Sequence, residues 1–213
     1  MHKPSIGLSL EGMPFIFFTT IATLTFALIG CWIMAFILLI TLFFVLNFFR
    51  DPERVVPTEP GVAVSPADGK VIGIKSMPDP LTGEMRTAIC VFMNVFNVHV
   101  NRMPVAGRIS RIAYFGGKFI NASFDKASSD NERNTVVVED EQGHCWTMVQ
   151  IAGLIARRIV CRVDEGDTLA RGQRYGMIRF GSRVDLYLPQ GYVAATRIGE
   201  QVFAGQGVVA RAK

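Results

Sequence analysis

Hydrophobic residues are concentrated near the start of the chain, in one long run without a charge. Between Glu11 and Arg50 lie 38 consecutive uncharged residues, mostly Phe, Leu, Ile, Ala and Thr. A membrane-spanning helix needs about 20 such residues, so the run is too long for one perpendicular span and slightly short for two generous ones. A Gly-Cys pair at positions 30–31 lies near its middle and could mark a turn between helices over 14–29 and 32–49.

We therefore expect residues 1–49 to form a helical membrane anchor, either a hairpin or a single span, and we favour the hairpin. A cleaved signal peptide is rejected. Its apolar core would be only about 7–15 residues long and would follow a basic segment, whereas here the apolar run has 38 residues and the charge of Lys3 is offset by that of Glu11. Arg50 and Arg54 follow the run, and basic residues mark the cytoplasmic side of a span. Both arrangements place the rest of the chain at the cytoplasmic face of the cell membrane.

From residue 50 onward the pattern changes to short β-rich runs separated by Gly, Pro and Asp. Spacing of this kind, without a convincing amphipathic helix of about 12 residues, indicates a mainly β domain over 50–213. The stretch 125–134 is polar and rich in turn residues, so we predict a long loop there. The predicted strands are 71–75, 86–92, 96–100, 108–115, 135–139, 145–151, 155–163, 177–180 and 184–188.

Two further segments, 62–71 and 163–173, have glycines at turn positions between apolar residues. The first is predicted to be a strand, a tight turn and another strand. Both resemble turns of the barrel-sandwich folds of biotinyl and lipoyl domains, so we expect a barrel-sandwich-like β domain. No lysine stands at the tip of a Met-Lys-Met-like hairpin, which argues against a carrier function.

The net charge of +4 lies entirely after residue 49. A mildly basic domain tethered to a bilayer is attracted to anionic lipid headgroups, although a soluble basic domain would have the same balance. The four cysteines lack C-x-x-C spacing, so neither a disulfide framework nor a metal site is expected. We expect no nucleic-acid partner, and the sequence leaves open whether the chain forms a homo-oligomer.

Three residues that are ordinary by themselves form a candidate catalytic set. Gly181-Ser182 stands between two strand-like runs, and Gly-Ser is a common turn pair. His99 lies in a predicted strand, on the face opposite its apolar residues, and Asp68 precedes a glycine in a turn, where aspartate is common. Together they offer the Asp and His that make a serine nucleophilic. A serine that follows a glycine carbonyl can also attack its own backbone.

The chain resembles the short form of the phosphatidylserine decarboxylase proenzymes. The resemblance covers nearly everything from residue 49 to about 190, and its motifs are weak individually but specific in combination and spacing. The stretches that carry it are Phe49-Arg50-Asp51-Pro52, Ser65-Pro66-Ala67-Asp68-Gly69-Lys70-Val71, Asn97-Val98-His99-Val100-Asn101-Arg102-Met103-Pro104, Asn131-Glu132-Arg133-Asn134 and Phe180-Gly181-Ser182.

The resemblance implies a self-processing enzyme with a covalent pyruvoyl cofactor. Ser182 would attack the Gly181 carbonyl, His99 would accept the hydroxyl proton, and Asp68 would orient His99. Elimination and hydrolysis would convert Ser182 into the pyruvoyl group and divide the chain into a β chain, 1–181, and an α chain that stays bound as its heterodimer partner.

The resemblance also implies the substrate. The pyruvoyl carbonyl would form a Schiff base with phosphatidylserine and accept the electron pair released with CO2, giving phosphatidylethanolamine. Long members carry a histidine three residues before the one matched by His99, where this chain has Phe96, so the proton donor stays open. Arg102, Arg133 and Lys118 are candidates for binding the headgroup's carboxylate and phosphate.

Two other hypotheses about the function stay open. The chain could be a membrane-anchored adaptor without enzymatic activity, in which Asp68, His99 and Ser182 are structural. It could also be a pyruvoyl enzyme for another amino acid or lipid.

Overall fold

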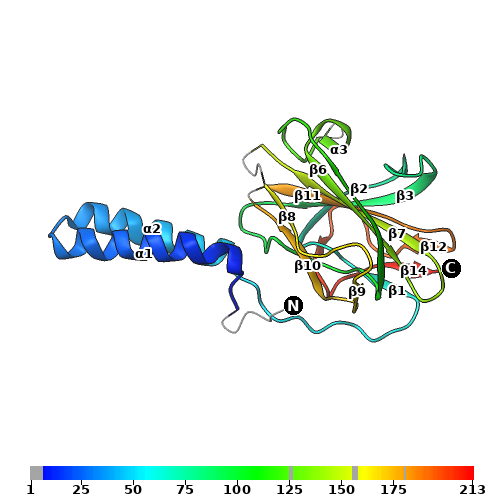
Figure 1. Cartoon of the computed structure of the whole chain (residues 1–213), viewed down its shortest axis with the longest axis horizontal. Helices are drawn as coiled ribbons and strands as arrows, with labels where there is room; N and C mark the ends of the chain where they lie inside the picture. Colours follow the sequence, from blue (N-terminus) through cyan, green and yellow to red (C-terminus); the bar gives the residue numbers. More distant parts are fainter. Residues whose placement is uncertain (1–6, 125–126, 155–157, 180) are drawn as a thin grey trace. The chain divides into compact units, whose positions relative to one another are not determined.

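The computed structural model describes residues 7–124, 127–154, 158–179 and 181–213. The chain divides into two compact units, Met1–Glu53 and Arg54–Lys213 (Figure 1).

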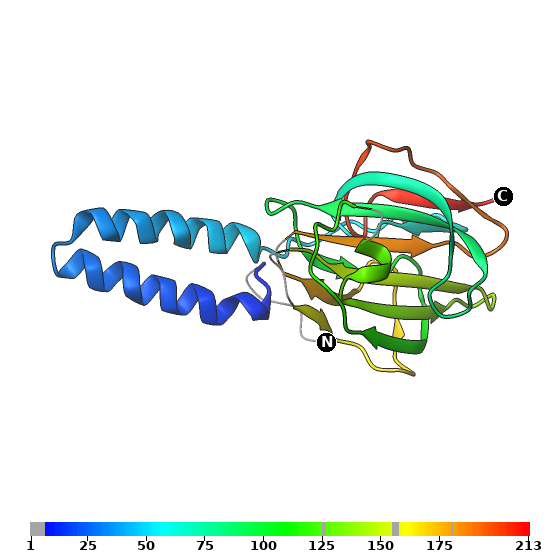
Figure 2. The same cartoon turned by 90° about the horizontal axis from the view of Figure 1, so that it is seen from above.

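The first unit is built on two apolar helices. A 3-10 turn, η1 (Leu10–Gly12), leads into α1 (Met13–Leu28), and α2 (Trp32–Phe48) follows after a tight turn. In that turn Gly30 has a φ of +77°, the left-handed conformation that glycine adopts without steric cost. The two helices pack side by side and run in opposite directions (Figures 1 and 2).

Threonine hydroxyls within the helices have local acceptors. Each donates to the carbonyl four residues earlier, as Thr20 does to Ile16 at 2.7 Å, and the same bond is made by Thr19, Thr23, Thr25 and Thr41. Polar groups in a hydrocarbon environment require such internal partners. The 19-residue helical stretch Leu10–Leu28 is long and apolar enough to cross a membrane, whereas α2 is apolar but shorter. How many helices cross stays a prediction.

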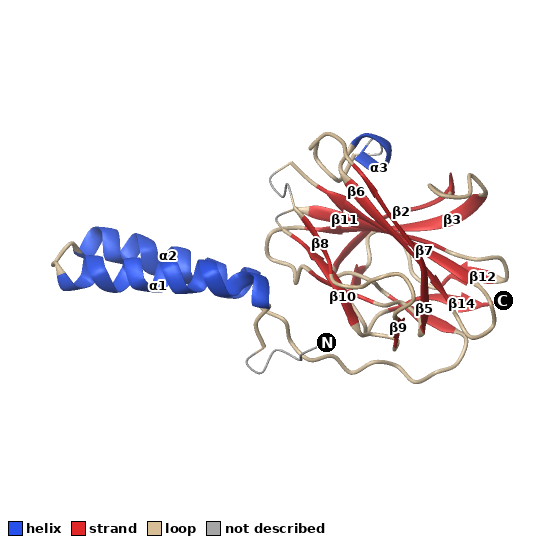
Figure 3. Cartoon of the chain, viewed as in Figure 1, coloured by secondary structure: helices blue, strands red, loops and turns tan. Residues whose placement is uncertain are grey.

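The second unit consists mainly of antiparallel strands (Figure 3). The largest sheet has the order β13-β2-β3-β11-β7-β6-β5-β9, and two three-stranded sheets have the orders β4-β10-β8 and β1-β14-β12. The strands are β1 (Val62–Val64), β2 (Gly69–Pro78), β3 (Met85–Met93), β4 (Val100–Arg102), β5 (Gly107–Phe115), β6 (Arg133–Glu139), β7 (Cys145–Ala152), β8 (Ile159–Cys161), β9 (Thr168–Leu169), β10 (Arg174–Ile178), β11 (Ser182–Tyr187), β12 (Tyr192–Ala194), β13 (Gln201–Val202) and β14 (Val208–Ala212). The predicted fold class, a mainly β domain after an apolar N-terminal helix, is confirmed.

Both faces of the large sheet are buried around β11. Val184 and Leu186 belong to the main hydrophobic core, together with Met148 of the neighbouring strand β7. On the opposite face, Tyr187 and Ile151 pack in a smaller cluster. Residues that alternate along a strand point to opposite faces, so Ser182 shares the core face of Val184 and Leu186.

Two predicted elements are corrected by the structure. The predicted strand 96–100 is irregular for most of its length, with a turn and a bend at its start, and β4 begins only at Val100. Asn94 causes the difference. Its side-chain oxygen accepts a hydrogen bond from the Phe96 backbone amide at 2.9 Å, and its backbone amide donates to the Asn97 side-chain oxygen at 2.9 Å. The predicted loop 125–134 contains a short helix, α3 (Ala127–Asp130), and the first residues of β6.

The remaining predicted strands correspond to observed ones with shifted ends. The first part of the predicted strand 155–163 and the last residue of 177–180 lie outside the described residues. Segment 62–71 does contain two strands, but they enter different sheets: β1 pairs with β14, and β2 pairs with β3 and β13.

Candidate active site

Ser182 is the first residue of β11 and is held in the sheet on both sides. It pairs with Met93 of β3 and with Ala152 of β7, and its side chain is fully buried. Gly181, directly before it, has a φ of +58°, and no atom of another described residue lies within 4 Å of the position that its β-carbon would take. Glycine is therefore favoured at 181 by its backbone conformation, not by crowding.

A chain of buried polar side chains begins at Ser182. Its hydroxyl lies 4.0 Å from the Met93 sulfur, which is also 3.9 Å from the Asn101 side-chain nitrogen. Gln150 donates to Asn101 at 2.8 Å and accepts from Asn134 at 3.0 Å. These contacts link the large sheet to β4 across the core. The sequence reasoning missed Met93 and Gln150, because both lie inside runs that read as ordinary strands.

His99 is fully buried and lies just before β4, not within a strand as predicted. Its Nδ1 lies 2.9 Å from the Asn97 carbonyl oxygen, in the same loop. Its own carbonyl accepts the Ile178 amide at 3.3 Å, at the end of β10. The chain continues from Ile178 toward Gly181, so His99 is joined by backbone contact to the strand that leads to the Gly-Ser pair.

Asp68 is buried in the turn before β2, and both of its oxygens have partners. Oδ1 accepts the Ala204 amide at 2.7 Å, and Oδ2 pairs with the Arg54 guanidinium at 2.7 Å. In the same turn, the Pro66 carbonyl accepts the Arg102 amide at 2.9 Å, which fixes the turn against β4. Sequence reasoning assigned Arg54 only to the exit from the membrane segment and missed its pairing with Asp68.

The strand register brings these segments to one end of the large sheet. There β2 begins at Gly69, β3 ends at Met93, β7 ends at Ala152 and β11 begins at Ser182. The turn with Asp68 and the loop with His99 leave from the same strand ends. The structure therefore places all three sequence-predicted residues, fully or almost fully buried, in segments at this end.

A buried ion pair lies behind Ser182, on the other face of β11. Arg183 binds Asp185 at 2.5 and 2.8 Å and donates to the Cys90 sulfur at 3.0 Å and to the Phe124 carbonyl at 3.4 Å. Burial by itself lowers the pKa of Arg183, but the Asp185 carboxylate outweighs it and raises that pKa above its ordinary value. Burial raises the pKa of Cys90 to about 12, so this cysteine stays a thiol.

Comparison with known proteins identifies the family. The profile of the family described as phosphatidylserine decarboxylase matches residues 41–210. The chain belongs to this family. It is 67% identical over 211 residues, 99% of this chain and 97% of the relative, to the phosphatidylserine decarboxylase proenzyme of Nitratidesulfovibrio vulgaris. It is 60% identical to the proenzyme of Oleidesulfovibrio alaskensis, over 100% of this chain and 98% of that one, and 48% identical to that of Burkholderia cenocepacia, over 99% and 98%.

In this member of the phosphatidylserine decarboxylase family, the three basic residues that are candidates for binding the substrate headgroup have different surroundings. Arg102 is buried and donates to the Gly172 carbonyl at 3.1 Å. Arg133 is half-buried at the start of β6 and lies 4.7 Å over the Phe115 ring. Lys118 is exposed, and its backbone bridges to that of Asn131. Because Arg133 stands beside Ile151 of β7, it lies at the Ser182 end of the sheet.

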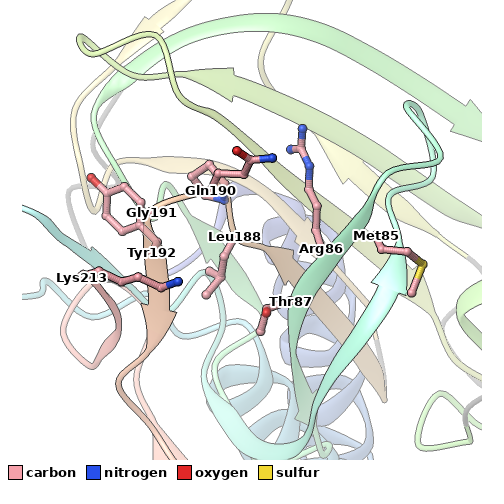
Figure 4. A pocket seen from close by; sticks show the side chains of 9 residues that line it. Met85, Arg86, Thr87, Leu188, Gln190, Gly191, Tyr192 and Lys213 are labelled. Atoms are coloured by element: carbon pink, nitrogen blue, oxygen red, sulfur yellow. The ribbon is translucent and has the colours of Figure 1, made fainter.

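One pocket among the described residues lies at the end of β3 and β11 that is opposite to Ser182 (Figure 4). Its volume is about 410 Å³, and it is lined by the first residues of β3, the 188–191 turn, Tyr192 and Lys213. Leu188 directly follows β11, six residues after Ser182. The pocket is therefore separated from the candidate site by the length of β11.

Proposed function

We propose that this chain is a self-processing phosphatidylserine decarboxylase, cut between Gly181 and Ser182. The observation that carries the proposal is the place of this pair: a left-handed glycine next to a buried serine at the first position of a central strand. A break at that point would leave the new N-terminus at residue 182 held by β3 and β7. Family membership and the proenzyme names of the relatives agree with it.

The proposed processing uses only atoms of the chain and one water. Ser182 Oγ adds to the Gly181 carbonyl carbon and the C–N bond breaks, so the amide becomes an ester with a free amino group. Elimination then breaks the Cβ–Oγ bond, releases the Gly181 carboxylate and leaves dehydroalanine at 182. Hydrolysis of its imine tautomer releases ammonia and leaves a pyruvoyl group.

His99 is proposed as the base that accepts the Ser182 proton, and Asp68 as the group that stabilises its charged form. Two backbone contacts support these roles of His99 and Asp68. The His99 carbonyl is bonded to Ile178, shortly before the cleavage site, and the Asp68 turn is bonded to β4 through Arg102. The Arg54 guanidinium pairs directly with the Asp68 carboxylate and holds it in place, which suits an aspartate that is to stabilise a positive imidazole.

The residues around Ser182 fit a pyruvoyl group at this position. The group would lie on the core face, beside Met93 and the amide chain of Asn101 and Gln150, where water is excluded and polar partners are fixed. Once formed at residue 182, the group would supply a carbonyl for condensation with the substrate amine and an acceptor for the electron pair released with CO2. Arg133 and Lys118 are proposed to attract the substrate carboxylate and phosphate.

The substrate is proposed to be the lipid and not free serine. The apolar stretch Leu10–Leu28 would hold the enzyme at the bilayer in which phosphatidylserine resides. Arg50 and Arg54, which follow the helices, favour the cytoplasmic face.

Intact mass spectrometry of the purified protein tests the proposal. We expect two chains that purify together, 1–181 and the 32-residue 182–213, with the smaller one lighter by one NH3 than simple hydrolysis would give. Ser182→Ala should stay at about 23.5 kDa, folded and inactive. Ser76→Ala, which changes an exposed serine of β2, should process normally.

The same preparations separate the alternatives. An adaptor would stay whole in the wild type, and a pyruvoyl enzyme for another substrate would be cut but would fail to convert phosphatidylserine. Activity of an uncut wild-type chain would refute the mechanism. Conversion of free serine at a rate equal to that of the lipid would refute the substrate assignment.

A further inference from the structure

Gly153 lies directly beside the carbonyl group at which the chain is proposed to be cut. It follows Ala152, which pairs with Ser182 across the neighbouring strands β7 and β11 (Figure 1). A β-carbon on Gly153 would lie 1.9 Å from the Gly181 carbonyl oxygen and 2.9 Å from its carbonyl carbon. Real β-carbons essentially never approach another heavy atom within 3.0 Å. The oxygen therefore occupies the space that any side chain at 153 would need.

The backbone conformation of Gly153 gives no separate reason for glycine. Its φ is outside the left-handed region, in contrast to Gly181 at +58°. An alanine could adopt the same backbone angles, so the close approach of the Gly181 carbonyl is what excludes a side chain. The two glycines are thus required for different reasons. Gly181 is required for its own backbone conformation, and Gly153 is required because the Gly181 carbonyl oxygen occupies the space of a side chain.

The surroundings keep the two groups in place. Asn131 donates to the Ala152 carbonyl at 2.7 Å and fixes the end of β7. The Ala122 β-carbon lies 3.5 Å from the position that a Gly153 β-carbon would take, so it bounds the same space from another direction. Ala122 is also buried. A methyl group added at 153 could therefore be accommodated only by a shift of the Gly181 carbonyl relative to Gly153.

We infer that Gly153 is a positioning residue that sets the orientation of the Gly181 carbonyl for attack by Ser182. The inference rests on the proposed self-processing and assigns no chemistry to Gly153 itself. A β-carbon at 153 would displace the carbonyl oxygen by about 1 Å to restore normal contact distances, and a misplacement of that size can cost about 100-fold in rate. Because the attacked carbon moves with its oxygen, formation of the ester is the step that slows.

The test compares Gly153→Ala with Gly116→Ala, in which the same methyl group would contact none of the described residues and the glycine is likewise outside the left-handed region. Precursors from cell-free synthesis are followed by gel over time. We expect Gly153→Ala to be processed about 100-fold more slowly than wild type, and Gly116→Ala at nearly the wild-type rate. Normal processing of folded Gly153→Ala would overturn the inference.

Hydroxylamine distinguishes positioning from a later effect, because it cleaves esters and leaves amides intact. Wild-type precursor should be cut faster at 181–182 in its presence, whereas Gly153→Ala should stay whole. Rapid hydroxylamine cleavage of Gly153→Ala would mean that the ester forms and that only elimination is slow, which contradicts the inference.

Folding is measured separately, in the uncut Ser182→Ala background, by comparing melting temperatures with and without Gly153→Ala. We expect Gly153→Ala to fold in this background, with a melting temperature within a few degrees of that of Ser182→Ala alone. Failure of Gly153→Ala to fold would mean that the methyl group acts on stability and not on the orientation of the carbonyl, which would overturn the inference. An uncut wild type would instead refute the proposed function, so the two failures are distinguishable.

Discussion

A serine hydroxyl is a weak nucleophile at its ordinary pKa, so Ser182 requires a proton acceptor. His99 is the buried histidine whose backbone is bonded to the strand leading to Gly181, whereas His144 lies partly exposed in the β6–β7 turn beside Asp140. Burial restricts the imidazole to few orientations and excludes competing water. These features make His99 the candidate base among the described histidines.

We expect His99→Ala to slow self-processing by at least about 100-fold, because a positioned general base contributes about 10²- to 10⁴-fold. The fraction of cut chain is followed by gel in freshly synthesised protein. His144→Ala serves as the matched histidine control and should be cut normally. If His99→Ala is folded and cut at the wild-type rate, His99 is not the base.

Single residues differ in how well the sequence alone could identify their roles. Ser182, His99 and Asp68 stand in short motifs and could be selected directly. Gln150 and Gly153 could not, because their roles depend on partners far away in the chain. Gln150 reads as one polar residue in a strand until its bonds to Asn101 and Asn134 are known. Gly153 reads as a loop glycine until the Gly181 oxygen is found in its side-chain space.

Strands with regular apolar alternation were predictable, and turns made by side chains were not. β11 and β7 follow from their patterns, because each has one face in the main core. The segment 96–100 has the same alternation, but Asn94 bonds to the backbone of its own loop and keeps it out of the sheet. This local competition decides where His99 lies, so the prediction that His99 belongs to a strand was wrong.

The β6–β7 hairpin is stabilised by one carboxylate. Asp140 accepts the Trp146 indole N–H at 3.0 Å, the His144 amide at 2.9 Å and the Gln142 amide at 3.0 Å. Burial raises the pKa of Asp140, but the hydrogen bonds from Trp146 and His144 outweigh burial and leave that pKa lowered. A lowered pKa in the folded state means that the charged form contributes stability above the ordinary aspartate pKa, which is lost as the pH falls through the folded value.

Asp140→Asn should therefore lower the free energy of unfolding at pH 7 by about 1 kcal/mol, which corresponds to a melting temperature lower by about 2–4 °C for a chain of this size. The deficit should begin to shrink below about pH 4, the ordinary aspartate pKa, and should disappear only as the pH falls through the lowered folded-state pKa of Asp140. Melting curves in detergent at pH 7 and at acidic pH measure the deficit, with Asp164→Asn as an exposed control. A deficit of equal size at both pH values would show that the charge of Asp140 is not the cause.

The whole molecule combines an apolar helical unit with a β unit that has its own core. This division would suit the proposed function, because helices that anchor the chain need only retain the catalytic unit at the bilayer that contains the lipid. The sequence predicted the two helical segments and the turn at positions 30–31 to within a few residues, since long apolar runs are the strongest signal in a sequence. It could not decide how many helices cross, because 38 residues suit neither one nor two full spans.

The basic residues that follow the apolar run predict on which side of the membrane the rest of the chain lies. Arg50 and Arg54 follow the apolar run, and positive charges next to a span are retained in the cytoplasm. An epitope placed after Lys213 should therefore resist protease in intact spheroplasts and be digested in inverted vesicles. A second epitope before Met1 distinguishes the anchors: a hairpin protects it in the same way, and a single span exposes it outside. A known periplasmic protein controls for access, and digestion of the C-terminal epitope in intact spheroplasts would contradict the cytoplasmic assignment.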